Sequence, residues 1–158
     1  MKKKFALTLV SLASVALLAA CGEVSTTGNS GSASGTEIGK TLKIGFNFEE
    51  TGDVASYGTA EQKAAKLAVD EINKAGGVDG KQIEVTDKDN KSELSEASTV
   101  STNLVTQAKV NAIIGPATSG GTGAAITNAA KASVPLITPS GTQDDLTKGQ
   151  DYLFRTTF

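Results

Sequence analysis

The sequence predicts an α/β fold, an open parallel sheet flanked by helices. Short segments in which every second residue is apolar alternate with longer segments in which apolar residues recur every three or four positions. The connections between these segments are short, and several contain Gly or Pro. Strands and helices that alternate in this way form parallel sheets through right-handed crossovers, so we expect helices on both faces of the sheet.

The first strand and the first helix follow from a change of period. Residues 41–48 place Leu42, Ile44 and Phe46 on one side of a strand. Residues 57–75 are expected to form a helix, and a pair of glycines ends it. The apolar stripe of this helix is expected to comprise Ala64, Leu67, Ala68, Ile72 and Ala75.

The second strand and helix repeat this pattern. Residues 81–86 alternate again, with Ile83 and Val85 directed inward. Ser92 is the expected N-cap of the following helix, because its side chain can accept a backbone N–H of the first turn. The apolar stripe of that helix is expected to comprise Leu94, Ala97, Val100, Leu104 and Ala108.

The remaining elements are shorter. Residues 110–114 are expected to form a buried strand that a Gly-Pro pair ends, and residues 119–131 an alanine-rich helix. Residues 134–137 are expected to form a fourth strand, and residues 152–156 to begin a fifth.

Composition excludes several classes of function. The chain has 158 residues, with 15 Lys and Arg against 17 Asp and Glu, and it has no His. The slight excess of acidic residues argues against a nucleic-acid-binding protein, which would have a basic face. Without His the common hydrolytic triads cannot form, and the one Cys can make neither an internal disulfide nor a thiolate metal site. These absences exclude much enzyme chemistry. We expect a monomer that is not an enzyme and that uses neither a metal nor a cofactor.

The N-terminal segment is expected to direct export. Residues 1–20 join a lysine-rich start to an apolar stretch that is too short and too rich in Ser and Ala for a membrane span, as in a signal peptide. The stretch ends in Leu18-Ala19-Ala20-Cys21, which resembles a bacterial lipobox and predicts a lipidated Cys21 at the extracytoplasmic face of the cell membrane. The alternative is an ordinary signal peptide with a chance cysteine. Residues 21–40 are rich in Ser, Thr and Gly and predict a flexible linker, which leaves residues 41–158 as the folded lobe.

Three loops follow the carboxyl ends of predicted strands, where open α/β sheets bind ligands. They comprise residues 49–56, 115–122 and 138–142. The second, GPATSGGT, differs from the phosphate-binding pattern G-x-x-x-x-G-K-[ST], because Gly121 replaces the lysine that contacts the phosphates. Nucleotide binding is therefore not our first choice.

The second and third loops together predict a site for an α-amino acid. Residues 115–122 offer Ser119 and free amides at a helix N-terminus, which suit a carboxylate. Residues 138–142 add carbonyls, hydroxyls and further amides, so both charges of the ligand can be met without a buried protein charge. Charge-assisted hydrogen bonds of about 1.5–3 kcal/mol each could supply much of the roughly 8 kcal/mol of micromolar binding. The alternative is that Ser119 and Thr142 only cap helices.

Six segments of the chain, in this order, resemble the branched-chain amino acid type of ABC-transporter substrate-binding protein, whose fold is of the type I periplasmic-binding-protein kind. They are TGDVASYG, AAKLAVDEIN, KAGGVDGKQIEV, IIGPATSG, VPLITPSGT and YLFRT. The resemblance extends from Leu42 to Phe158. It implies two α/β lobes that close on the ligand, and a lipid-anchored receptor that delivers an amino acid to a membrane permease.

The resemblance also implies roles for individual residues. Ser119 would hold the ligand's carboxylate by its hydroxyl and its amide, and the backbone of Ser140 would meet the ammonium. Thr142 would bind the head group, with Gly141 supplying backbone beside it. Tyr57 would pack over the head group, although it could also be an ordinary aromatic residue at the start of a helix.

The chain departs from the family in its length. Family members are considerably longer, so we expect this chain to be either a fragment or a truncated product without the second lobe, which in the family supplies an acidic contact to the ammonium and the groups that select the side chain. A single lobe also loses the exclusion of water that strengthens polar contacts. We therefore expect weak or undetectable binding by these 158 residues alone.

Two other functions stay open. The same fold could bind another small polar solute, such as an amide or urea. An anchored enzyme with a Rossmann-like lobe would need an acid that binds ribose, and Asp87 and Asp89 follow the second predicted strand. However, the first strand is not followed by G-x-G-x-x-G, so we interpret Asp87 and Asp89 as a solvated turn.

Overall fold

The computed structural model describes residues 36–157, and these form a parallel sheet with helices on both faces. The sheet order is β2-β1-β3-β4-β5, and every neighbouring pair is parallel. The strands are β1 (Leu42–Phe48), β2 (Ile83–Asp89), β3 (Ala112–Ile114), β4 (Leu136–Thr138) and β5 (Leu153–Arg155). The helices are α1 (Ala55–Lys74), α2 (Leu94–Asn103), its π-helical continuation η1 (Leu104–Ala108), and α3 (Ser119–Lys131). The predicted fold class is confirmed.

The predicted signal peptide of residues 1–20, Cys21 and most of the predicted linker lie outside the described residues. Within residues 36–157 no helix has the length and the apolar character needed to cross a bilayer. The described chain begins at the amino-terminal edge of the sheet, where the side-chain amide of Asn111 donates to the carbonyl of Thr36 at 2.9 Å.

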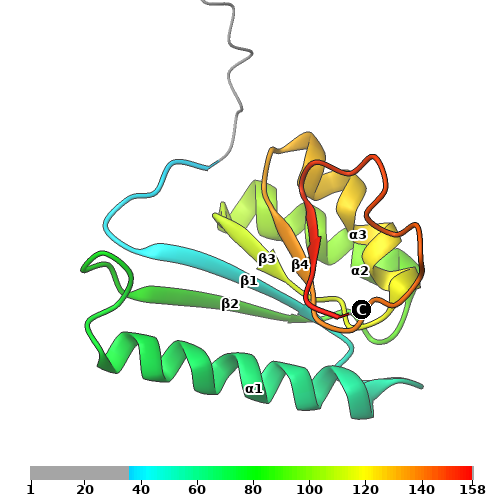
Figure 1. Cartoon of the computed structure of the whole chain (residues 1–158), viewed down its shortest axis with the longest axis horizontal. Coiled ribbons are helices and arrows are strands. Elements are labelled where there is room, and N and C mark those ends of the chain that lie inside the picture. The colour runs from blue at the N-terminus through cyan, green and yellow to red at the C-terminus, as the bar shows by residue number, and fades with distance from the viewer. Residues whose placement is uncertain (1–35, 158) are drawn as a thin grey trace, which may run out of the picture. The chain divides into compact units, whose positions relative to one another are not determined.

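Two apolar clusters lie on opposite faces of the sheet, one under α1 and one under α2 and α3 (Figure 1). Strand β1 contributes Ile44 and Phe46 to the α1 cluster, as predicted, and Leu42 packs against it. Phe48 also belongs to this cluster, and the rings of Phe46 and Phe48 pack edge to face with their centroids 5.7 Å apart. On its other face β1 places Gly45 against Leu104, and a Cβ at Gly45 would lie 2.8 Å from a methyl carbon of that leucine. The absence of a side chain at this position therefore lets η1 approach the sheet closely.

The predicted inward stripe of α1 is wrong. All five of its residues are exposed, with Leu67 at 60% and Ile72 at 39%; the other three are Ala64, Ala68 and Ala75. The residues that pack on the phenylalanines of β1 are Ala65 and Val69 instead.

Polar contacts with β2 explain the rotation of α1. The amide of Gln62 donates to Asp87 Oδ2 at 2.7 Å. The side chain of Asn73 accepts the N–H of Ile83 at 2.7 Å and donates to its carbonyl at 2.9 Å. These bonds fix which side of the helix faces the sheet, and the apolar stripe is thereby turned away from it.

The apolar stripe of α2 is largely correct. Ala97, Val100 and Leu104 are buried, whereas Leu94 is 57% exposed. Ser92 is not the N-cap, because the helix begins one residue later and its N-cap position, Glu93, makes no side-chain capping bond.

The predicted shorter elements differ from the observed ones mainly at their beginnings. The helix at residues 119–131 is correct. Val110 and Val134 are fully buried, but they precede β3 and β4 rather than belonging to them. The predicted strands at residues 110–114 and 134–137 began too early because each included an apolar residue that is buried but lies before the observed strand.

Candidate ligand-binding site

A cavity of about 430 Å³ lies at the carboxyl edge of the sheet, where the loops after β1, β3 and β4 meet. It is lined by Val54, Tyr57, Ala117, Thr118, Ser119, Ser140, Thr142 and Thr157. Four of the five residues predicted for the site are among them, and the fifth, Gly141, is buried beside them. The other lining residues, Val54, Ala117, Thr118 and Thr157, were not predicted from the sequence.

The amino-terminal half of the loop after β3 donates hydrogen bonds to the buried carboxylate of Glu49. One oxygen of Glu49 accepts the N–H of Ala117 at 2.9 Å. The other accepts the N–H of Thr118 at 3.2 Å and its hydroxyl at 2.8 Å. This finding corrects two expectations, since these two amides are not free for a ligand and a buried protein charge does lie behind the site.

The first turn of α3 leaves two amides without a hydrogen-bond partner in the described chain. Thr118 is the N-cap, and its side chain accepts the N–H of Gly121 at 3.1 Å. Within residues 36–157 the amides of Ser119 and Gly120 make no hydrogen bond. The Ser119 oxygen accepts the N–H of Gln143 at 3.2 Å, which leaves its hydroxyl proton available. The alternative that Ser119 only caps a helix is therefore wrong.

The loop after β4 is joined to the loop after β3 through Thr138. Its hydroxyl donates to the carbonyl of Pro116 at 2.8 Å and accepts the N–H of Gly141 at 3.1 Å. A Cβ at Gly141 would lie 2.6 Å from Leu146 Cδ2, so a side chain there would displace Leu146. Thr142 is exposed and starts no helix in the described chain, which rules out the capping alternative for it as well.

Ser140 is held by a second carboxylate. Its hydroxyl donates to Glu61 Oε1 on α1, while Oε2 of the same carboxylate is buried and has no partner among residues 36–157. Burial raises the pKa of Glu61, the hydrogen bond from Ser140 offsets part of this rise, and the negative charge of Glu49 adds to it. Two carboxylates thus lie behind the cavity wall.

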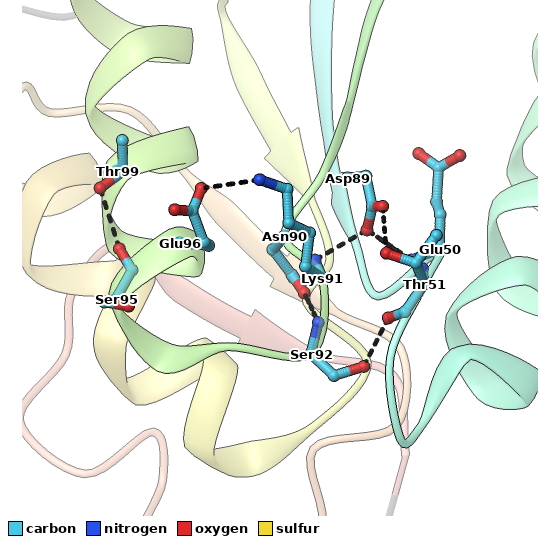
Figure 2. Close-up of polar contacts among 9 residues, drawn as sticks. All are labelled: Glu50, Thr51, Asp89, Asn90, Lys91, Ser92, Ser95, Glu96 and Thr99. Carbon is cyan, nitrogen blue, oxygen red and sulfur yellow. Dashed lines mark hydrogen bonds and ion pairs between the residues drawn. The ribbon is translucent and has the colours of Figure 1, made fainter.

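The loop that leads from β1 to α1 is bonded to the end of β2 (Figure 2). The Asp89 carboxylate accepts the N–H of Glu50 at 3.0 Å, the N–H of Thr51 at 3.2 Å and the Thr51 hydroxyl at 2.6 Å. Ser92 accepts the N–H of Val54 at 3.3 Å and donates to the Thr51 carbonyl at 2.7 Å. The side chain expected to cap α2 therefore fixes this loop instead.

Asp87 and Asp89 are not a solvated turn, because both belong to β2. Asp87 pairs with Lys66 of α1 at 2.6 Å and accepts the Gln62 amide. Partial burial by itself would raise the pKa of Asp89, but the Thr51 hydroxyl and nearby backbone amides hold it below the ordinary aspartate value. Both residues thus have structural partners that account for their positions.

Residues 36–157 contain no group of three acidic, Cys or His side chains that could hold a metal ion. What the carboxyl edge offers is a set of backbone amides, hydroxyls and carbonyls around a small cavity. This arrangement suits binding of a small polar molecule.

Comparison with known proteins then decides the family. Residues 41–158 match the family described as periplasmic binding protein. The chain belongs to this family. Its members are transport proteins that bind substrates outside the cytoplasm and are not enzymes, so the predicted resemblance and the prediction of a non-enzyme are confirmed.

Relatives of this chain bind amino acids. It is 35% identical over 127 residues to a leucine-, isoleucine-, valine-, threonine- and alanine-binding protein of Pseudomonas aeruginosa, covering 80% of this chain and 34% of that protein. It is 34% identical over 107 residues to the Leu/Ile/Val-binding protein BraC3 of Rhizobium johnstonii, covering 68% of this chain and 29% of the relative. The chain thus spans about a third of the length of these relatives.

Solved structures of substrate-binding proteins are also similar to this chain. The chain is 74% identical, with a TM-score of 0.74, to the branched-chain amino acid transporter substrate-binding protein LivJ of Streptococcus pneumoniae in complex with isoleucine; the match covers 75% of this chain and 34% of that one. A solute-binding protein of Rhodopseudomonas palustris in complex with 3,4-dihydroxybenzoic acid is 33% identical, with a TM-score of 0.70, over 76% of this chain and 32% of that one.

Proposed function

We propose that residues 41–158 are the N-terminal lobe of a substrate-binding protein that captures a branched-chain amino acid for an ABC importer. The observation that carries this proposal is the cavity lined by Tyr57, Ser119, Ser140 and Thr142. These are the residues whose roles the family resemblance implies, and relatives that share this lobe bind isoleucine or leucine.

The geometry supports different roles for the loops after β3 and β4, one binding the ligand's carboxylate and the other its ammonium group. The Ser119 hydroxyl and the open amides of Ser119 and Gly120 are the donors for the ligand's carboxylate at the N-terminus of α3. The backbone of Ser140 and the hydroxyl of Thr142 meet the ammonium and the rest of the head group. Tyr57, which is 64% exposed, covers the head group from α1.

The charges behind the cavity favour a ligand with an ammonium group. Glu49 is 1% exposed and the Glu61 carboxylate has a buried oxygen, and both lie behind the loops that line the cavity. Negative charge close to the site raises the affinity for a cation and lowers that for a simple anion. A zwitterion therefore suits this edge better than a carboxylic acid without an amino group.

Calorimetry and thermal unfolding test this function on the complete product of the reading frame that contains these residues. Leucine or isoleucine at one hundred times its Kd should stabilise the protein by about 2.7 kcal/mol. Two other ligand classes are compared in parallel: urea and acetamide, and the acids 4-methylpentanoate and 3,4-dihydroxybenzoate. Stabilisation by a member of one of those classes and by no amino acid would contradict the proposal.

Binding by the 158 residues alone is a separate question. We expect only weak binding of leucine, visible as shifts of the Ser119, Gly120 and Gly141 amide signals in NMR spectra at millimolar ligand. The reason is that an open cavity leaves the polar contacts in competition with water. Micromolar affinity of the isolated chain in calorimetry would show this expectation to be wrong.

We also propose export, lipid anchoring and delivery of the ligand to a membrane permease. Residues 1–20 would be removed, Cys21 would carry lipid, and residues 21–40 would link the anchor to the lobe, with the protein acting as a monomer at the extracytoplasmic face. Expression in a bacterial host compares the parent chain with Cys21→Ser. The parent should fractionate with membranes and the variant should not; equal membrane association of both would contradict lipidation.

A further inference from the structure

The carboxylate of Glu49 has no cationic partner in the described chain. The side chain is 1% exposed, and the two ion pairs found among residues 36–157 are Lys66–Asp87 and Lys91–Glu96. Its charge is stabilised by three donors from the loop after β3: the amide of Ala117, and the amide and hydroxyl of Thr118. A buried carboxylate that accepts hydrogen bonds from one loop in this way strongly constrains the conformation of that loop.

Both helices that border the site also fix the position of Glu49. A Cβ at Gly58 in the first turns of α1 would lie 2.2 Å from the Glu49 carbonyl oxygen, so helix and backbone are in direct contact. A Cβ at Gly121 in the first turn of α3 would lie 3.1 Å from Glu49 Oε1. The backbone of Glu49 is thus packed against α1, and its carboxylate lies beside the first turn of α3.

The hydrogen bonds of Glu49 determine which donors of α3 stay open. Thr118 donates its hydroxyl to Glu49, so its oxygen is oriented to accept the N–H of Gly121. With the Ala117 and Thr118 amides also taken, the open donors at this helix end are the amides of Ser119 and Gly120 and the Ser119 hydroxyl. The choice of open donors is thus set by a residue that does not line the cavity.

We propose that Glu49 is a positioning residue for the ligand's carboxylate, which it orients by holding Ala117 and Thr118 away from the ligand and presenting Ser119 and Gly120 to it. This inference rests on the proposed function. Glu49 itself touches no ligand, and it acts through the conformation of residues 115–119.

The test replaces Glu49 by glutamine in the complete product of the reading frame that contains these residues. Glutamine keeps the shape of the side chain but has a single acceptor oxygen, so its NH₂ group must face one of the loop's donors. We expect Glu49→Gln to weaken leucine binding at least tenfold in calorimetry. Glu50→Gln removes the same charge from the adjacent residue, whose side chain does not contact this loop, and should change the affinity less than twofold.

A comparison of two ligands separates positioning from general destabilisation. Leucinamide has the ammonium and the side chain of leucine but lacks the carboxylate, so its binding depends less on this loop. Glu49→Gln should therefore lower the ratio of leucine affinity to leucinamide affinity at least threefold. A merely structural role would lower both affinities by the same factor or lower only the thermal stability.

Thr118 provides a second test if Glu49→Gln does not fold. Thr118→Val removes the hydroxyl that joins Glu49 to Gly121, so it should weaken leucine binding several-fold and lower the same ratio. Thr118→Ser keeps that hydroxyl and should lower the ratio less than Thr118→Val does. An unchanged ratio in Glu49→Gln, or in Thr118→Val if Glu49→Gln does not fold, would overturn the inference, and so would equal effects of Glu49→Gln and Glu50→Gln. Failure of the parent protein to bind any amino acid would overturn the proposed function itself, and the inference with it.

Discussion

The contact between Gly45 and Leu104 gives a prediction that can be worked through as a double-mutant cycle. A Cβ added at Gly45 would lie 2.8, 2.9 and 3.2 Å from Leu104 Cδ1, Cδ2 and Cγ, and no other atom is among its three nearest neighbours. Truncation of Leu104 to alanine removes all three of these atoms. The two substitutions should therefore compensate each other.

The magnitudes follow from the burial of both sites. Leu104 is fully buried, so Leu104→Ala should cost about 3 kcal/mol of unfolding free energy. Gly45→Ala alone should cost about 1–2 kcal/mol, because overpacking of roughly 1–3 kcal/mol is partly offset by the better strand propensity of alanine. In the Leu104→Ala background the same change should cost nothing or stabilise by up to about 1 kcal/mol.

Urea unfolding followed by circular dichroism, in the chain without residues 1–20, measures the four free energies. The control cycle pairs Gly45→Ala with Leu136→Ala, a buried leucine of the same cluster on β4, two strands away from β1. That cycle should be additive within about 0.5 kcal/mol. An equal cost of Gly45→Ala in the parent and in the Leu104→Ala background would refute the reasoning, because the clash would then not be with Leu104.

Three further predictions concern stability. Gly58→Ala should lower the free energy of unfolding by more than about 3 kcal/mol, because its Cβ would meet the backbone oxygen of Glu49. Gly123→Ala has nothing within 4 Å of the added Cβ and should stabilise α3 by roughly 0.5–1 kcal/mol. Urea unfolding measures both changes, and similar free energies of unfolding for the two variants would contradict the prediction. The pKa of Asp89 is lowered in the folded state, so the ionised carboxylate stabilises the fold fully above the unfolded-state pKa, and this stabilisation is lost as the pH falls through the folded-state pKa. Asp89→Asn should therefore make the free energy of unfolding fall less steeply with decreasing pH. An unchanged slope would contradict this prediction. The pKa of Glu61 is raised in the folded state, so its ionised form disfavours folding at neutral pH. Glu61→Gln should therefore raise the thermal unfolding temperature at pH 7 and have little effect on it at pH 3. A lower unfolding temperature of the variant at pH 7 would contradict the raised pKa.

The sequence was most informative where one physical rule dominates. The alternation of Leu42, Ile44 and Phe46 predicted the face of β1, because a strand's two sides are set by its backbone geometry. The position of the cavity followed from the rule that all strands of a parallel sheet end at one edge. Neither result needs knowledge of which residues are neighbours in space.

The rotation of α1 could not be predicted in this way. Leu67 and Ile72 form an apolar stripe, yet bonds from Gln62 and Asn73 to β2 decide which side faces the sheet. Such bonds depend on the partner strand's position, and the periodicity of the helix carries no information about it.

Glu49 was the main omission at the site. Its signal in the sequence is an acidic residue directly after an apolar strand, at the edge where helix N-termini gather, and such a position favours a carboxylate that accepts backbone amides. That signal predicts a carboxylate near some helix end. It does not identify Ala117 and Thr118 as the partners, which follows only from the adjacency of β1 and β3.

The parallel topology has a practical consequence for attaching the protein to a surface. The described chain enters at Thr36, beside Asn111 at the amino-terminal edge of the sheet, while Ser119 and Tyr57 lie at the opposite edge. A sensor chip or bead coupled upstream of Thr36 is therefore joined to the lobe at the end remote from the cavity. Immobilisation through the N-terminus should leave solute access unobstructed, whereas random coupling through surface lysines would orient a fraction of the molecules with their cavities against the support.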